Sequence, residues 1–296
     1  MKWGMSLIIL FSVLDITSWI YDTRFNKNLR ITFIDVGQGN SALIQFPGKK
    51  RMLIDGGGFR GGTFDTGEKI VAPLLFRKKI LHIDYIVLTH PHPDHINGLK
   101  FIASEFTPSE FWYNGDPSEN SEFKDLMGIV KSKNLQILTP DHLSHGITIS
   151  GVRVEILHPS GHVKDPVFLI SGNRAVNNRS LVLRMTYNGK SILFPGDIEE
   201  DAENRLVEKY GKKLKSDVML VPHHGSRYST TESFLGMVGP EICIISSGSG
   251  NSFGFPNSET IERLNKAGSR IFRIDKKGAV RVEIGDGYFY SGYYLD

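Results

Sequence analysis

Three histidines and an aspartate stand within six positions in the stretch YIVLTHPHPDHINGLKFI, directly after an apolar run. They are His90, His92, Asp94 and His95, in a chain that has ten histidines in all. Imidazole and carboxylate groups are ligands for zinc, manganese and iron. Because one ion needs three or four ligands, two ions are expected if other segments contribute. The stretch therefore predicts a metal site rather than a polar loop with incidental histidines.

The two prolines of HPHPDH indicate how these side chains converge. Proline stiffens the backbone and keeps the residue before it extended. In extended chain, side chains two positions apart point to the same side. His90 and His92 are therefore expected to face one point, with Asp94 on the same side. His95 begins the turn into a helix and is expected to face a second point nearby.

The elements around this segment read as strands alternating with helices. Residues 83–90 are apolar and predict a buried strand, and residues 95–106 have helical spacing. Residues 30–46 and 51–58 predict strands on either side of the turn signal PGKK. Polar residues at the ends of these strands are therefore expected to meet at one edge of the sheet.

The second half of the chain repeats this pattern. Residues 180–197 predict a hairpin around Asn188-Gly189, residues 216–226 predict a strand, and residues 270–287 predict a closing hairpin. Hairpins followed by alternating helices and strands in both halves predict two sheets packed face to face with helices outside. The expected fold class is α+β, a four-layer αββα sandwich.

The composition excludes several classes of protein. The chain is 40% hydrophobic and 23% charged, which argues against disorder. A formal net charge of +3 is compatible with a polyanionic partner but does not identify one. The single cysteine, Cys243, excludes an internal disulfide and a cysteine-rich zinc site, and its apolar surroundings predict a packing role. No phosphate-binding glycine loop stands in a strand–helix setting, so no nucleotide cofactor is expected.

The first 25 residues form a separate apolar segment. The run from residue 4 to residue 21 is near the short limit for a bilayer span. A cleaved signal peptide is disfavoured because no alanine precedes Ala42. Residues 1–25 therefore predict a membrane anchor or the end of a membrane helix, the alternative being a buried first helix or strand. Residues 30–296 are the expected catalytic domain. Lys2 before the apolar run favours placing that domain on the extracytoplasmic side.

Three motifs together resemble the metallo-β-lactamase fold superfamily. THPHPDHING is similar to its His-x-His-x-Asp-His signature, LIDGGG to its early motif and FPGDIEEDAE to its later one. The resemblance implies an αββα sandwich that binds two divalent ions, zinc or manganese. It implies that Asp55 supports the site and that Asp197 bridges the two ions.

The same resemblance implies how the ligands divide. His90 and His92 would hold one ion, and Asp94 and His95 the other, together with one histidine of VPHHGS. Spacing does not decide between His223 and His224 for that last ligand. The implied catalytic residues are Asp94, His95 and Asp197.

A narrower resemblance covers residues 30 to 266. The segments FIDVGQGNSALIQFPGKKRMLIDGGG, NNRSLVLRMTYNGKSILFPGDIE, VPHHGS and GNSFGFPNSETIERL are similar to the hydrolase domain of ComEC-type competence DNA-uptake proteins. In that family the domain accompanies a membrane channel and is thought to degrade the DNA strand that is not transported. The resemblance implies DNA and a channel part as partners and a membrane-associated location.

Other polar residues are expected near the centre, with less defined roles. In DVGQG, Asp35 and Gln38 either support the site and receive phosphate or form a plain turn. Asn178 stands where many superfamily members carry a histidine, so it is either a weak oxygen ligand or leaves a position open. Ser226 is expected to contact phosphate. The aromatic run at residues 111–113 could stack on bases, but core packing is the favoured interpretation.

The chain departs from its relatives at two further places. Asn40 replaces an aspartate that many carry, and Phe255-Pro256-Asn257 replaces a His-Pro-His segment. Three functions remain open. The first is a metal-dependent DNA phosphodiesterase. The second is a small-molecule esterase of the same fold, acting on phosphorylcholine esters, lactones or thioesters. The third is a non-catalytic DNA-binding or channel-gating domain, which the changed positions motivate.

Overall fold

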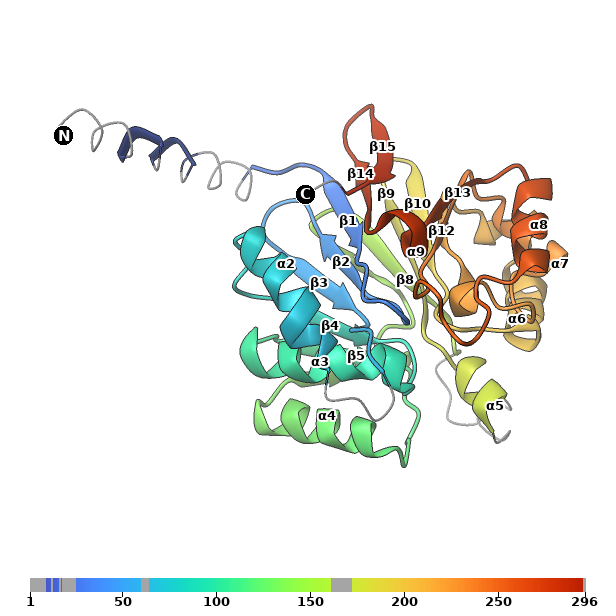
Figure 1. Cartoon of the computed structure of the whole chain (residues 1–296), viewed down its shortest axis with the longest axis horizontal. Helices are drawn as coiled ribbons and strands as arrows, with labels where there is room; N and C mark the ends of the chain where they lie inside the picture. Colours follow the sequence, from blue (N-terminus) through green and yellow to red (C-terminus); the bar gives the residue numbers. More distant parts are fainter. Residues whose placement is uncertain are drawn as a thin grey trace.

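Two β-sheets lie against each other in the computed structural model, and helices cover their outer faces (Figure 1). The structure describes residues 9–11, 13–15, 17, 25–59, 64–160 and 172–294. Within these, the first sheet has the order β15 (Phe289–Tyr293), β14 (Val280–Ile284), β1 (Leu29–Phe33), β2 (Ala42–Gln45), β3 (Arg51–Ile54), β4 (Tyr85–Leu88), β5 (Glu110–Tyr113) and β6 (Gln136–Leu138). The second has the order β13 (Arg270–Arg273), β12 (Ile242–Ile245), β11 (Val218–Leu220), β10 (Lys190–Phe194), β9 (Val182–Tyr187), β8 (Val152–His158) and β7 (Ile147–Ile149).

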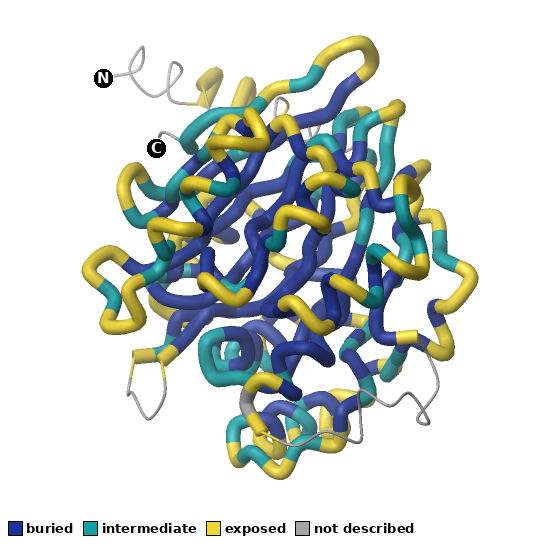
Figure 2. The backbone as a smooth tube through the Cα atoms, turned by 90° about the vertical axis from the view of Figure 1, so that its right-hand side faces the viewer, coloured by how far each residue is buried: buried dark blue, intermediate teal, exposed yellow. Residues whose placement is uncertain are grey.

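The helices fall into two layers. The first sheet is covered by η1 (Gly67–Val71), α2 (Ala72–Arg77), α3 (Pro93–Glu105) and α4 (Ser121–Ser132). The second half of the chain contributes α5 (Asn173–Asn177), α6 (Glu200–Tyr210), η3 (Gly211–Leu214), η4 (Pro222–Gly225), α7 (Glu232–Val238), α8 (Ser258–Lys266) and α9 (Ile274–Lys277). Figure 2 shows the strands buried beneath these more exposed helices and loops. The predicted four-layer α+β sandwich is confirmed.

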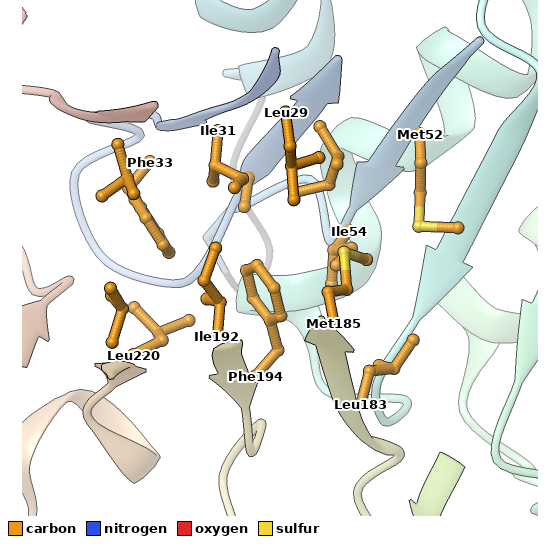
Figure 3. Packing of buried hydrophobic residues seen from close by; sticks show 14 of the residues in the cluster. Leu29, Ile31, Phe33, Met52, Ile54, Leu183, Met185, Ile192, Phe194 and Leu220 are labelled. Atoms are coloured by element: carbon orange, nitrogen blue, oxygen red, sulfur yellow. The ribbon is translucent and has the colours of Figure 1, made fainter. Parts of the chain in front are cut away.

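Strand alternation explains the layers. In β4, Val87 points to the opposite sheet, whereas Ile86 and Leu88 pack against the helices of the first layer. Between the sheets, Phe33 of β1 stacks on Phe194 of β10 with ring centroids 5.8 Å apart (Figure 3). Each fully buried side chain of this kind stabilises the fold by about 1.5–3 kcal/mol.

Burial decides the roles of two features singled out in the sequence, the aromatic run and the single cysteine. Phe111 and Trp112 are fully buried, so they are core residues and not a stacking surface. Cys243 is a free, buried thiol in the core between the second sheet and its helices. Burial raises the pKa of its thiol to about 12, which suits a packing role.

The predicted closing hairpin at residues 270–287 is wrong. β13 pairs in parallel with β12 in the second sheet, whereas β14 pairs with β1 and β15 in the first. The chain therefore crosses between the sheets at α9. Local pattern cannot reveal this crossing, because both strands carry apolar residues and the intervening turn is short. The predicted strand at 216–226 is also shorter, since it ends at Leu220 and turns through η4.

The apolar segment 1–25 lies mostly outside the described residues, so the membrane anchor stays a prediction. Among the residues that the structure does describe, no helix has both the length and the apolar character to span a bilayer.

Candidate metal centre

Four side chains from three separate loops meet at one edge of the sandwich. Asp94, His95, Asp197 and His224 each offer a ligand atom, and these atoms all lie within 4.8 Å of one another. Asp94 and His95 lie in the first turn of α3, after β4. Asp197 follows β10 and His224 follows β11, and these two strands run parallel. Their carboxyl ends therefore share one edge, the usual location of sites in such sheets.

The carboxylate of Asp197 is the centre of this cluster. Its Oδ2 lies 3.3 Å from Nε2 of His95 and 3.3 Å from Nε2 of His224. Oδ2 of Asp94 lies 3.3 Å from the same Nε2 of His224. One carboxylate thus faces two imidazoles that come from opposite halves of the chain.

Hydrogen bonds on the far side of each ring fix which nitrogen faces the cluster. Nδ1 of His95 lies 2.7 Å from Oδ2 of Asp55, which also accepts from the hydroxyl of Thr89. Nδ1 of His224 donates to the carbonyl of Ser246 at 2.8 Å. Both Nε2 atoms are therefore turned inward. Such partners set the tautomer and orientation of metal-binding histidines.

The inward atoms make no hydrogen bond within the described part of the chain, although carboxylate oxygens lie near both nitrogens. Nε2 of His95, Nε2 of His224 and Oδ1 of Asp197 are buried without a hydrogen bond. Buried polar atoms are seldom left in this state, because each costs about 1–3 kcal/mol. A divalent cation among imidazole and carboxylate ligands would satisfy all three atoms, so the residues present fit a metal ion.

The charges within the cluster also suit a bound cation. Burial by itself would lower the pKa of His224, but the carboxylates of Asp197 and Asp94 raise it to about 10. Burial disfavours the charge of Asp197, yet the neighbouring imidazoles of His224 and His95 hold its pKa well below the usual value. Ionised carboxylates thus face protonated imidazoles, and a cation that binds here would release those protons.

His90 and His92 lie beside the four-residue cluster. Nε2 of His90 lies 3.8 Å from Oδ2 of Asp197 and 3.1 Å from Nδ1 of His92. Burial, and then the charge of His95, lowers the pKa of His90 well below its usual value, so its ring is neutral, as a metal ligand must be. This pair can therefore hold a second ion that shares Asp197 with the first.

The turn that carries His223 and His224 is left-handed. Its residues have φ of 47° for His223, 56° for His224 and 85° for Gly225. A non-glycine residue in this region costs about 1–2 kcal/mol. A Cβ on Gly225 would lie 2.6 Å from Cβ of Pro256, so only glycine fits there. The strain is retained where the turn brings the imidazole of His224 into the cluster, which is typical of functional sites.

Comparisons with known proteins identify the family of the chain. Residues 34–248 match the family model described as the metallo-beta-lactamase superfamily. The chain belongs to the metallo-beta-lactamase superfamily. It is 29% identical over 265 residues to ComE operon protein 3 of Bacillus subtilis, covering 85% of this chain and 32% of that protein. It is 29% identical over 287 residues to Recombination protein 2 of Haemophilus influenzae, covering 93% of this chain and 30% of that one.

These comparisons confirm the resemblance to ComEC-type competence proteins. This superfamily member spans about a third of the length of the curated relatives that it matches. Among solved structures, Igni18, a metallo hydrolase from Ignicoccus hospitalis, has a TM-score of 0.51 at 14% identity, covering 90% of this chain and 100% of its own. At that identity the likeness supports the fold alone.

The structure distinguishes His223 from His224 as the candidate ligand, a choice that sequence spacing does not make. His224 belongs to the four-residue cluster of this metallo-beta-lactamase fold. Nε2 of His223 is 4.0 Å from Oδ2 of Asp197, and its Nδ1 is 3.3 Å from Oε1 of Glu199. We therefore assign His224 as the candidate ligand and His223 as its neighbour at the rim.

The remaining predicted site residues bond mainly to loop backbone. Asp35 is exposed and accepts from the backbone nitrogen of Gly37. The side-chain oxygens of the other three also accept backbone N–H groups: Gln38 from Gly248 at 3.1 Å, Asn178 from Glu199 at 2.8 Å and Ser226 from Tyr228 at 3.3 Å. Their direct part in binding stays a prediction.

The glycine loop does approach the centre closely. A Cβ on Gly39 would lie 2.1 Å from the carbonyl oxygen of Asp94, and the backbone nitrogen of Asn40 donates to that oxygen at 3.3 Å. Asn40 is buried, and neither polar atom of its side chain has a partner among the described residues. Asn257, the other departure, caps α8 by accepting from the backbone nitrogen of Glu259.

Sequence reasoning missed Glu199. This buried carboxylate contacts His223 and accepts from Nε of Arg174 at 2.6 Å. Arg174 stands over the ring of Tyr228 at 5.1 Å. In the sequence, Glu199 is marked only by its position two residues after Asp197, and this position does not predict a contact with a histidine from another loop.

Asp55→Asn is expected to weaken metal binding about 10- to 100-fold, the usual effect of removing a partner that orients a ligand. The amide presents a donor to groups that now donate to the carboxylate, so the ring of His95 loses its fixed orientation. Competition with a chelator measures the affinity. Asp84→Asn is the matched control, since Asp84 is a buried carboxylate that accepts from the backbone nitrogen of Arg51, away from the centre. Equal affinity of Asp55→Asn and wild type would contradict this role.

Proposed function

We propose that this chain is a metal-dependent phosphodiesterase that cuts DNA and degrades the strand that is not transported during competence DNA uptake. The observation that carries the proposal is the convergence at one sheet edge of buried ligand atoms of His95, His224 and Asp197 that make no hydrogen bond among the described residues. The similarity to competence proteins over most of the chain supports DNA as the substrate.

The residues divide the work as follows. Asp94, His95 and His224 would hold one divalent ion, zinc or manganese, and His90 and His92 a second, with Asp197 between them. When bound, such ions polarise a phosphoryl oxygen and lower the pKa of water. Asp55 and the carbonyl of Ser246 keep the two Nε2 atoms aimed inward. Arg174, held by Glu199, offers a fixed positive charge for the DNA backbone.

The proposal includes a membrane setting. The relatives are about three times longer than this chain, so further parts of the uptake machinery lie outside the matched region. We propose a membrane channel part as the partner, residues 1–25 as the attachment, and the extracytoplasmic side as the location of the hydrolase domain.

The test is a cleavage assay with defined metal content. Chain stripped by a chelator and reloaded with manganese or zinc is expected to cut single-stranded or duplex DNA, and chelator is expected to stop the reaction. Hydrolysis of bis(p-nitrophenyl) phosphate without DNA cleavage would support the small-molecule esterase instead. Salt-dependent DNA binding without turnover under either metal would support the non-catalytic domain.

A further inference from the structure

An exposed aromatic ring, that of Phe253, is the outermost of a row of contacting rings that leads to the histidine turn. This row, called the ladder below, consists of Phe253, Phe255 and the two histidines of the turn. Phe253 lies in the loop between β12 and α8 with 64% of its surface exposed, and it stacks on Phe255 at 5.7 Å with an interplanar angle of 17°. The ring of Phe255 contacts that of His223 at 5.4 Å and that of His224 at 6.2 Å. The ladder thus runs from solvent to the candidate metal centre in two ring-to-ring steps.

The loop holds this ladder in a fixed conformation. Oδ1 of Asn251 accepts from the backbone nitrogens of Phe253 and Phe255 at 3.1 and 3.0 Å. Nδ2 of Asn251 donates to the carbonyls of Gly248 and Phe255 at 2.8 and 2.6 Å. One side chain therefore ties both ends of the loop together and sets the backbone of both phenylalanines. A ring fixed before binding loses little entropy when a ligand stacks on it.

The loop is also docked on the histidine turn. The backbone nitrogen of Asn257 donates to the carbonyl of Gly225 at 2.9 Å, and Pro256 fills the space where Gly225 has no Cβ. The orientation of Phe253 is therefore coupled to that of His223 and His224. Isolated surface phenylalanines are common and need no explanation. This one differs because it is rigidly joined to the candidate ligands.

A positive charge is linked to the same turn through Glu199. Arg174 is bound to Glu199, and Glu199 contacts Nδ1 of His223. Beyond that bond its guanidinium makes only the contact with the ring of Tyr228 within the described residues, and its side chain is exposed. An exposed aromatic ring and an exposed guanidinium are thus both linked to His223, the ring through Phe255 and the guanidinium through Glu199. Grooves that bind single-stranded nucleic acid without sequence preference combine these two elements, one for bases and one for phosphates.

We propose that the outer face of Phe253 is a stacking site for an unpaired nucleobase of single-stranded DNA whose backbone crosses the metal centre. This inference rests on the proposed function and deepens it, because it makes the substrate a polymer with bases rather than a small phosphodiester. Stacking tolerates every sequence, since each base has a π face.

The test compares two oligonucleotides of equal length and charge, an oligothymidylate and its abasic analogue. Phe253→Ala is expected to weaken binding of the oligothymidylate about tenfold, within the ~1–3 kcal/mol that one stacked base contributes. Binding of the abasic analogue should change less than about twofold, because the phosphate contacts remain. Phe253→Trp should restore the affinity, and its indole fluorescence should be quenched by the oligothymidylate alone.

Phe76→Ala is the matched control. Phe76 is also an exposed phenylalanine, at 55%, and its ring contacts a second ring, that of Phe106, at a tilt of 31°, but it lies on α2 over the other sheet. It is expected to bind both oligonucleotides as the wild type does.

The outcomes distinguish failure of the stacking site from failure of the proposed phosphodiesterase function. If the wild type cuts DNA and Phe253→Ala changes the affinity for the two oligonucleotides by the same factor relative to the wild type, or changes neither, the stacking site is wrong and the phosphodiesterase stands. In that case a protein partner for Phe253 becomes the better interpretation. If the wild type favours the oligothymidylate through Phe253 but cuts no DNA with either metal, the stacking site stands and the phosphodiesterase fails. A wild type that binds neither oligonucleotide overturns both.

Discussion

Asp197→Ala is expected to lower kcat/KM for DNA about a thousandfold or more and to remove bound metal. Its Oδ2 is the atom on which the centre converges, at 3.3 Å from the inward nitrogens of His95 and His224 and 3.8 Å from that of His90. A divalent ion supplies several kcal/mol of transition-state stabilisation, and each 1.36 kcal/mol is tenfold in rate. Removing the carboxylate that the two proposed ion sites share is therefore expected to cost more than removing a ligand of one.

Metal content by elemental analysis and the rate of DNA cleavage measure this effect. Because the loss of a buried charge also destabilises the fold, Asp197→Asn should be studied beside the alanine variant. It keeps the volume of the side chain, and circular dichroism will show whether each variant folds. Asp201→Ala is the control, since Asp201 is an exposed carboxylate on α6, four residues along the chain. An active Asp197→Asn with full metal content would show that the shared site is misassigned.

The sequence predicted those parts of the centre that depend on local pattern. The prolines around His92 extend the chain and start α3, so His92 takes the N-cap position with extended φ and ψ and Asp94 falls in the first turn. The hairpin of β9 and β10 follows from alternating apolar residues around Asn188-Gly189. Continuous apolar strands in both halves were enough to predict two covered sheets.

What the sequence could not supply depends on contacts between distant segments. The choice between His223 and His224 is made by the left-handed turn and by the carbonyl of Ser246, which binds one ring and not the other. The contact between Glu199 and His223 joins loops after different strands. β13 and β14 look like one hairpin until their partners in separate sheets are known.

The ladder at Phe253 illustrates the same limit. The sequence showed that Phe255-Pro256-Asn257 departs from the relatives, and the departure was read as a loss. In the structure the changed residues have their own contacts, since Phe255 supports Phe253 and Asn257 begins α8. Sequence pattern cannot reveal such a contact between neighbouring rings, because it depends on the conformation of the loop.

His224→Ala is expected to reduce metal affinity by more than about 100-fold, and His223→Ala by less, about 10- to 100-fold at most. The inward nitrogen of His224 lies among Asp94 and Asp197, where a lost ligand leaves a coordination position empty. His223 lies at the rim against Glu199, and the loss of such an outer partner costs about 10- to 100-fold at most. Competition with a chelator measures both variants on one scale.

The two variants are each other's control. The residues are adjacent, have φ of 47° and 56°, and undergo the same change, so the strain of an alanine in the left-handed turn is nearly equal in both. A difference in metal affinity therefore reports the side chains and not the backbone. A greater loss in His223→Ala would reverse the assignment, because the ring of His223 would then have to leave Glu199 and rotate towards Asp197 when metal binds.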